Sequence, residues 1–150
     1  MSAKYSRASP SPRYRRLIEQ YQHMHLYGEQ FLGIAPEDTF PGGSLLQQAP
    51  AIKRLIKATA ATTILDYGCG KGRQYLPLRV PDPSEGVEYP DIQSYWGAQT
   101  IQRYDPAYAP FAQLPGGRFD GVICTDVLEH CPEELKEKIV ASPSLATARQ

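Results

Sequence analysis

A glycine-rich loop is the clearest chemical feature of the sequence. Residues 66–72, Asp-Tyr-Gly-Cys-Gly-Lys-Gly, directly follow a short run of β-forming residues at 63–65. Glycine adopts positive φ angles easily and, because it has no Cβ, lets the backbone come close to a ligand. A helix that starts after such a loop offers unpaired N–H groups to a nucleotide-like ligand or a carboxylate. We therefore expect a nucleotide-type site here, followed by a helix from about Lys71 to Pro77.

The spacing of these glycines differs from two common nucleotide-binding loops. A dinucleotide-binding loop has the pattern G-x-G-x-x-G, but the residue after Gly72 is Arg73. A P-loop has the pattern G-x-x-x-x-G-K-[ST], which is absent from the sequence. The loop therefore argues against an NAD-type oxidoreductase and against a P-loop nucleotidase.

Three segments, taken in order, resemble the class I S-adenosylmethionine-dependent methyltransferases. Residues 66–72 resemble the first motif of that family, D-x-G-x-G-x-G. Residues 101–106, IQRYDP, are similar to its second strand, and residues 119–130, FDGVICTDVLEH, to its fourth strand and the following turn. The resemblance covers roughly residues 44–135 and is nearest to the small-molecule enzymes of the quinone-biosynthesis type. It implies an α/β, Rossmann-like three-layer fold with a mostly parallel sheet, and methyl transfer from S-adenosyl-L-methionine to an unidentified small molecule.

The resemblance also implies which residues hold the cofactor. The loop positions that would pass beneath its methionine and ribose groups are Gly68, Cys69, Gly70 and Gly72. Asp66 would help to hold the ammonium group of the cofactor, directly or through water. Asp105 would accept hydrogen bonds from the two ribose hydroxyls, as an acidic residue does at the end of the second strand in dinucleotide-binding folds.

A second acidic residue is an alternative ribose ligand. The usual ribose acid lies ~20 residues beyond the glycine loop, and Glu88 stands at that distance from Gly68. If Glu88 ended the second strand, residues 101–105 would form the third strand and Asp105 would lie near the adenine. We favour Asp105, because residues 101–104 have a stronger strand pattern than the short, proline-bounded segment around Glu88.

Asp126 and His130 are the candidate catalytic residues. Methyl transfer from a sulfonium is an in-line displacement, so position matters more than a nucleophilic side chain. A hydroxyl acceptor also needs a base, and His130 is the natural one because imidazole is largely neutral at pH 7. A structural role for His130, capping a turn or a helix, is the alternative. Asp126 would orient the substrate or hold the methionine end of the cofactor.

Helices and strands that position these residues follow from the hydrophobic pattern. Apolar residues at helical spacing predict a helix from Arg13 to about Gly28. A second helix is expected to begin at Ser44, with Pro50 in or near its first turn. Strands are expected at 63–65, at 101–104 and within 119–127, and a last helix at 132–141.

The predicted domain organisation is simple. Residues 1–12 are expected to be a disordered basic tail, 13–141 a methyltransferase-like domain with an insertion at 77–100, and 142–150 a second tail. A complete domain of the resembled family continues with about three more strands. We therefore expect an incomplete sheet with the later strands missing, to be completed by a partner or a second copy. A truncated, non-catalytic cofactor-binding remnant or partner subunit is the alternative function.

Composition narrows the class of protein further. The formal net charge of zero gives no reason to expect nucleic acid. No apolar run reaches the ~20 residues that a membrane helix requires. Three cysteines without a secretory signal suggest free thiols and a cytoplasmic protein. Neither the group Cys124, His130 and Cys131 nor the pair His23 and His25 has zinc-ligand spacing, so we expect no metal.

Overall fold

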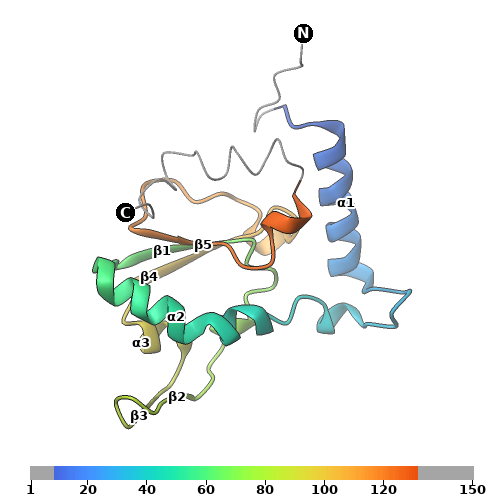
Figure 1. Ribbon diagram of the computed structural model, residues 1–150. Helices are drawn as coiled ribbons and strands as arrows, with labels where there is room; N and C mark the ends of the chain where they lie inside the picture. The colour runs from blue at the N-terminus through green and yellow to red at the C-terminus, as the bar shows by residue number, and fades with distance from the viewer. Residues whose placement is uncertain (1–8, 132–150) are drawn as a thin grey trace.

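The structure is a computed structural model that describes residues 9–131. This part of the chain consists of alternating helices and strands (Figure 1). The helices are α1 (Pro12–Tyr27), α2 (Gly43–Thr59) and α3 (Ile92–Trp96). The strands are β1 (Thr63–Tyr67), β2 (Val80–Asp82), β3 (Val87–Tyr89), β4 (Thr100–Tyr104) and β5 (Gly121–Ile123). None of the helices in residues 9–131 is long and apolar enough to cross a membrane.

A parallel sheet of three strands, in the order β4-β1-β5, forms the centre of the fold. Asp66 of β1 is paired with Arg103 of β4 on one side and with Ile123 of β5 on the other. After β1 the chain forms β4 on one side of it and later β5 on the other side. Because the strands are parallel, their three carboxyl ends lie at the same end of the sheet. This arrangement confirms the expected parallel, Rossmann-like α/β fold.

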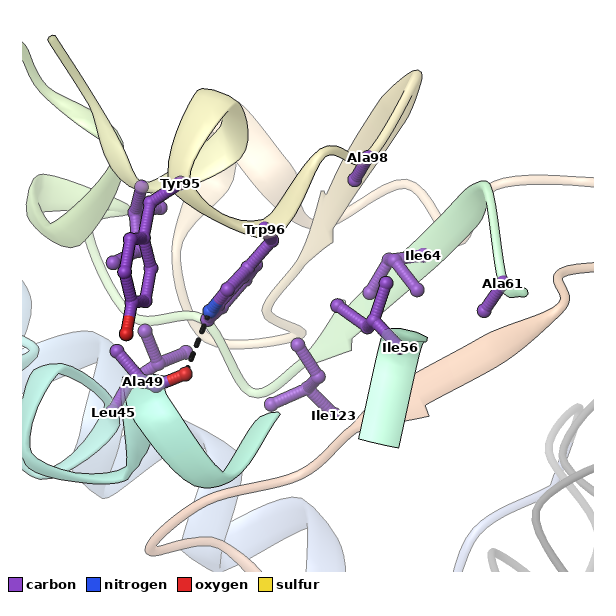
Figure 2. Packing of buried hydrophobic residues seen from close by; sticks show 10 residues of the cluster. Leu45, Ala49, Ile56, Ala61, Ile64, Tyr95, Trp96, Ala98 and Ile123 are labelled. Carbon is purple, nitrogen blue, oxygen red and sulfur yellow. Dashed lines mark hydrogen bonds between the residues drawn. The ribbon is translucent and has the colours of Figure 1, made fainter. Parts of the chain in front are cut away.

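Two helices cover one face of this sheet. Leu45, Ala49 and Ile56 recur on one side of α2, as expected for an amphipathic helix, and are buried. They pack against the strands and against α3, whose Trp96 donates its indole N–H to the carbonyl of Ala49 at 3.0 Å (Figure 2). Because the indole N–H finds a partner, this large ring can be fully buried in the core.

The opposite face is covered by the segment between β4 and β5 and by the residues after β5. Its buried cluster consists of Leu65, Tyr67, Tyr104 and Phe119, with Val127 packed at the edge. The rings of Tyr67 and Tyr104 lie 5.0 Å apart. Strand β1 is therefore buried on both faces, which agrees with its continuous apolar sequence.

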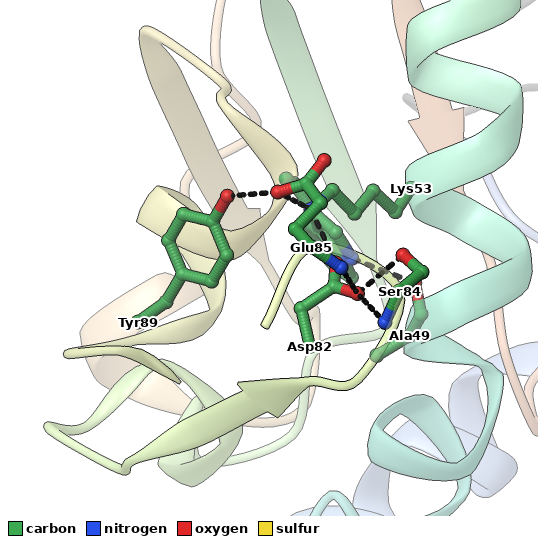
Figure 3. A network of polar contacts seen from close by, with 7 residues as sticks. Ala49, Lys53, Asp82, Ser84, Glu85 and Tyr89 are labelled. Carbon is green, nitrogen blue, oxygen red and sulfur yellow. Dashed lines mark hydrogen bonds and ion pairs between the residues drawn. The ribbon is translucent and has the colours of Figure 1, made fainter. Parts of the chain in front are cut away.

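Residues 77–100, the predicted insertion, form the antiparallel hairpin β2–β3 and the helix α3. Lys53 of α2 holds this hairpin through ion pairs to Asp82 at 2.6 Å and Glu85 at 3.2 Å (Figure 3). Its ammonium group also lies over the rings of Tyr89 and Tyr95, 4.6 and 4.5 Å from their centroids. Although burial lowers it, the hydrogen bonds to Asp82, Glu85 and Tyr89 raise the pKa of Lys53.

The boundaries of several elements differ from the predicted ones. The first helix begins at Pro12, and the hydroxyl of Ser11 accepts the N–H of Tyr14, so the ordered fold reaches into the predicted tail. The second helix begins at Gly43, and Pro50 lies in its interior instead of its first turn. Strand β5 is shorter than the strand predicted within 119–127, because only residues 121–123 are paired. The predicted helix 132–141 and the tail 142–150 lie outside the described residues.

The prediction of a helix after the glycine loop is wrong. Only a single 3₁₀ turn, Arg73–Tyr75, follows the loop. Gly72 before this turn is left-handed, with φ of 67°, and Leu76 after it is extended, with ψ of 156°. Pro77 explains the early stop, since a residue that precedes proline is displaced from the helical region.

Candidate functional site

A cavity of 440 Å³ opens at the carboxyl ends of the three parallel strands. Its wall is formed by residues 67–70 at the end of β1, 105–107 after β4 and 125–127 after β5. The strand order reverses at this point, which is where open α/β sheets bind their ligands. Helix α1 and residues 40–45 close the remaining side (Figure 1). The volume suits a small molecule or a nucleotide cofactor.

The first part of the glycine loop, residues 67–70, lines this cavity, and its glycines are tightly enclosed. Gly68 has φ of 84°, and a Cβ there would lie 2.2 Å from Val127 Cγ2. A Cβ on Gly70 would lie 3.0 Å from that of Phe40. Gly72 does not line the cavity, and a Cβ there would meet the side chains of Arg103 and Phe111. Gly68 and Gly70 thus let neighbouring segments close over the loop.

Contrary to expectation, the amide groups of Gly68, Cys69 and Gly70 already have hydrogen-bond partners within the fold. The N–H groups of Gly68 and Cys69 both donate to the carbonyl of Tyr104, at 2.7 and 3.1 Å. The N–H of Gly70 donates to Asp105 Oδ2 at 2.8 Å. Because no α-helix starts here, the loop offers space and side chains to a ligand instead of a helix N-terminus.

Asp105 lies at the end of β4 and lines the cavity. Its Oδ2 accepts the N–H of Gly70 and its Oδ1 accepts the N–H of Ala107, both at 2.8 Å. Each carboxylate oxygen keeps a further lone pair. Glu88, the alternative, belongs to β3 and pairs with Arg79 at 3.0 Å, and it is not among the residues that line the cavity. Strand β4 lies next to β1 and is followed directly by Asp105. It therefore occupies the place of the second strand in the fold that the sequence resembles.

Asp66 lies beneath the loop and not in the cavity wall. Its side chain is buried, and its Oδ2 accepts hydrogen bonds from Tyr75 Oη at 2.8 Å and Gln74 Nε2 at 3.1 Å. Burial raises the pKa of Asp66 to about 6, although the hydrogen bonds from Tyr75 and Gln74 lower it. Gln74, which the sequence analysis did not single out, does line the cavity. The geometry thus favours an indirect role for Asp66.

Asp126 and His130, the candidate catalytic residues, both line the cavity, and their catalytic role stays a prediction. Asp126 follows β5 in a left-handed conformation, with φ of 53°, and accepts a hydrogen bond from the hydroxyl of Ser44. Ser44, expected only to begin the second helix, thus fixes this carboxylate. The imidazole of His130 lies edge-on to the ring of Tyr21, with centroids 6.2 Å apart. Burial, followed by the charges of Cys131, Glu129 and Asp105, raises the pKa of Tyr21, which therefore stays protonated.

An aromatic stack joins α1 to the glycine loop. Phe40, with φ of 54°, lies 5.5 Å from Tyr21 and 4.5 Å from His25, measured between ring centroids. Lys71 of the loop donates to Thr39 Oγ1 at 2.6 Å and to the carbonyl of Pro36. The segment before α2 is thereby fixed over the loop, and no periodic sequence pattern indicates these contacts.

Thiol and metal chemistry find little support in this site. Burial raises the pKa of Cys124 to about 12 and also raises the pKa of Cys69, so both thiols stay protonated. Within residues 9–131, no group of three or more His, Cys, Asp or Glu side chains is placed to hold a metal ion.

The structure is that of an α/β protein with a cavity at the switch point of a parallel sheet. A family model described as "Methyltransferase domain" matches residues 43–137, more than half of the chain. The chain therefore belongs to the class I methyltransferase family. Comparisons with curated proteins and with solved structures give no match.

Proposed function

We propose that this protein transfers a methyl group from S-adenosyl-L-methionine to a small-molecule acceptor bound in the same cavity. The observation that carries the proposal is the meeting of the glycine loop, Asp105 and Asp126 around one cavity at the switch point of the sheet. When bound there, the cofactor would supply an electrophilic methyl group on a cationic sulfonium. The family match supports methyl transfer as the chemistry.

The residues of the cavity fit such a cofactor. Asp105 has carboxylate lone pairs left to accept the two ribose hydroxyls. Gln74 Oε1 is a buried acceptor with no hydrogen-bond partner among the described residues. In the part of the chain that the structure describes, the lining contains Asp105 and Asp126 but no Lys or Arg. A cationic cofactor with hydroxyl and ammonium donors matches this set of acceptors.

The acceptor half of the cavity consists of Asp126, His130 and the apolar and aromatic face of α1. Tyr14, Leu17 and Tyr21 form this face, which would exclude water and hold an apolar or aromatic acceptor. Asp126, fixed by Ser44, would orient the acceptor. His130 would take the proton from a hydroxyl acceptor.

Titration with S-adenosylhomocysteine tests cofactor binding directly. We expect the unmodified protein to bind it and Gly70→Leu to lose binding, since the loop has no room for a side chain beside Phe40. Gly97→Leu is the matched control, because Gly97 also has positive φ but has open space around it and does not line the cavity. Equal binding by Gly70→Leu and the unmodified protein would refute the site.

Transfer of a radiolabelled methyl group to a panel of small hydroxy and amino acceptors tests catalysis. His130→Gln should slow transfer to hydroxyl acceptors by roughly 10²- to 10⁴-fold while S-adenosylhomocysteine affinity stays the same. Unchanged transfer would remove His130 from the proton path and favour its structural role.

A further inference from the structure

We infer that Gln74 is a ligand-binding residue whose side-chain carbonyl accepts a hydrogen bond from the ammonium group of the methyl donor. The inference rests on the proposed function and assigns a binding role to a residue that no sequence motif indicates. Gln74 belongs to the single 3₁₀ turn after the glycine loop, is only 3% exposed and lines the cavity.

The orientation of the Gln74 amide is fixed by its neighbours. Its Nε2 donates to Asp66 Oδ2 and to the carbonyl of Cys69, both at 3.1 Å. The carbonyl of Cys69 can only accept a hydrogen bond, and the same holds for the carboxylate of Asp66 when it is ionised. The amide nitrogen of Gln74 must therefore face both groups. The carbonyl oxygen, Oε1, consequently points away from Asp66.

Gln74 Oε1 is an acceptor without a donor. It is buried and makes no hydrogen bond within residues 9–131. A Cβ on Gly42 would lie 2.5 Å from this oxygen, and Gly42, like Gln74, lines the cavity. Only a glycine backbone therefore leaves room beside Oε1. Buried polar atoms without a partner are rare in folded proteins, and a ligand that supplies the donor explains this one.

The charges around Gln74 select a cationic donor. The cavity wall contains the carboxylates of Asp105 and Asp126 and, within the described residues, no Lys or Arg. The bond from Nε2 to Asp66 polarises the amide and makes Oε1 a stronger acceptor. An ammonium group has three N–H donors and forms charge-assisted hydrogen bonds, whereas a sulfonium has no N–H and the adenine amino group is neutral. Asp66 thus acts on the ammonium through Gln74.

A pair of ligands separates this contact from a merely structural role. S-adenosylhomocysteine carries the ammonium and carboxylate groups, S-adenosyl-3-thiopropylamine keeps only the ammonium, and 5′-methylthioadenosine has neither. Gln74→Met keeps the length of the side chain and removes the amide. We expect it to weaken binding of the first two ligands by roughly 10- to 100-fold, as for loss of a hydrogen bond to a charged group, and to leave methylthioadenosine affinity unchanged.

Gly42→Ala provides a second variant that leaves Gln74 itself in place. Its Cβ would fill the space beside Oε1, so it should weaken both amine-bearing ligands more than methylthioadenosine. Gly97→Ala is the matched control, since Gly97 also has positive φ, a Cβ there meets nothing within 4 Å, and it does not line the cavity. If melting curves show that Gln74→Met does not fold, Gly42→Ala decides the question with the same ligands.

The outcomes distinguish this inference from the proposed function. If the unmodified protein binds none of the three ligands, the proposed function itself fails. If it binds them, and both Gln74→Met and Gly42→Ala weaken all three equally or none at all, Gln74 has only a structural role and the inference is overturned.

Discussion

Replacing Asp66 with Asn should change how the stability of the protein depends on pH. Burial raises the pKa of this carboxyl from 3.8 to about 6 in the fold. A raised pKa means that the folded state holds the proton more tightly, so this contribution to stability is complete below pH 3.8 and is lost as the pH rises through about 6. A shift of two units corresponds to about 3 kcal/mol in all, of which roughly 2 kcal/mol falls between about pH 4.5 and 7.5.

Urea unfolding of the unmodified protein and of Asp66→Asn across that range measures the effect. The difference between the two free energies of unfolding cancels the titration of every other group. Relative to the unmodified protein, Asp66→Asn should gain about 2 kcal/mol as the pH rises from about 4.5 to 7.5. Weaker hydrogen bonds from Gln74 and Tyr75 to the amide would add only a constant offset.

Asp120→Asn is the control with the opposite sign. Hydrogen bonds from the backbone of Thr62 and Thr63 lower the pKa of Asp120, so its contribution to stability is present at neutral pH and lost in acid. Its difference from the unmodified protein should therefore stay nearly constant down to about pH 4.5 and shrink as the pH falls below 3.8. A difference for Asp66→Asn that stays constant with pH would refute a raised pKa at Asp66.

Three further predictions concern the site and the core. Gly68→Ala should abolish S-adenosylhomocysteine binding because its Cβ would lie 2.2 Å from Val127 Cγ2. Combining Gly68→Ala with Val127→Ala should recover part of the binding, and no recovery would contradict the steric explanation. Asp105→Asn should weaken the same binding by roughly 10- to 100-fold and Glu88→Gln should not; the reverse order would assign the ribose to Glu88. Trp96→Phe should lower the free energy of unfolding by roughly 1–3 kcal/mol in urea and leave the ligand affinity unchanged, since Trp96 does not line the cavity.

The central strands and the motif residues next to them could be predicted from the sequence. Runs of β-formers at 63–65 and 101–104 are local signals, and both segments are strands in the structure. Asp105 and His130 follow predicted strands and Asp126 lies at the end of one, and parallel strands bring their carboxyl ends together. The order of the segments follows from the family resemblance, because strand periodicity alone does not indicate it.

Contacts between remote segments could not be predicted in this way. Ser44 binds Asp126, and Lys71 binds Thr39, through single polar side chains whose sequence neighbours show no pattern. Proline normally breaks a helix, which predicts Pro50 in or near the first turn, yet Pro50 lies in the interior of α2. Tertiary contacts, which a single sequence does not reveal, decide such positions.

The parallel pairing of β1 has a consequence for the order of folding events. Thr63 pairs with Thr100, and Ile64 pairs with Gly121, so neither neighbour of β1 can be reached by a short hairpin. Long chain segments must close before these pairs form, which slows folding of such topologies. The three loops of the cavity meet only after both closures, so a nascent chain acquires binding competence late, together with the finished sheet. From then on, any ligand stabilises the whole fold by mass action.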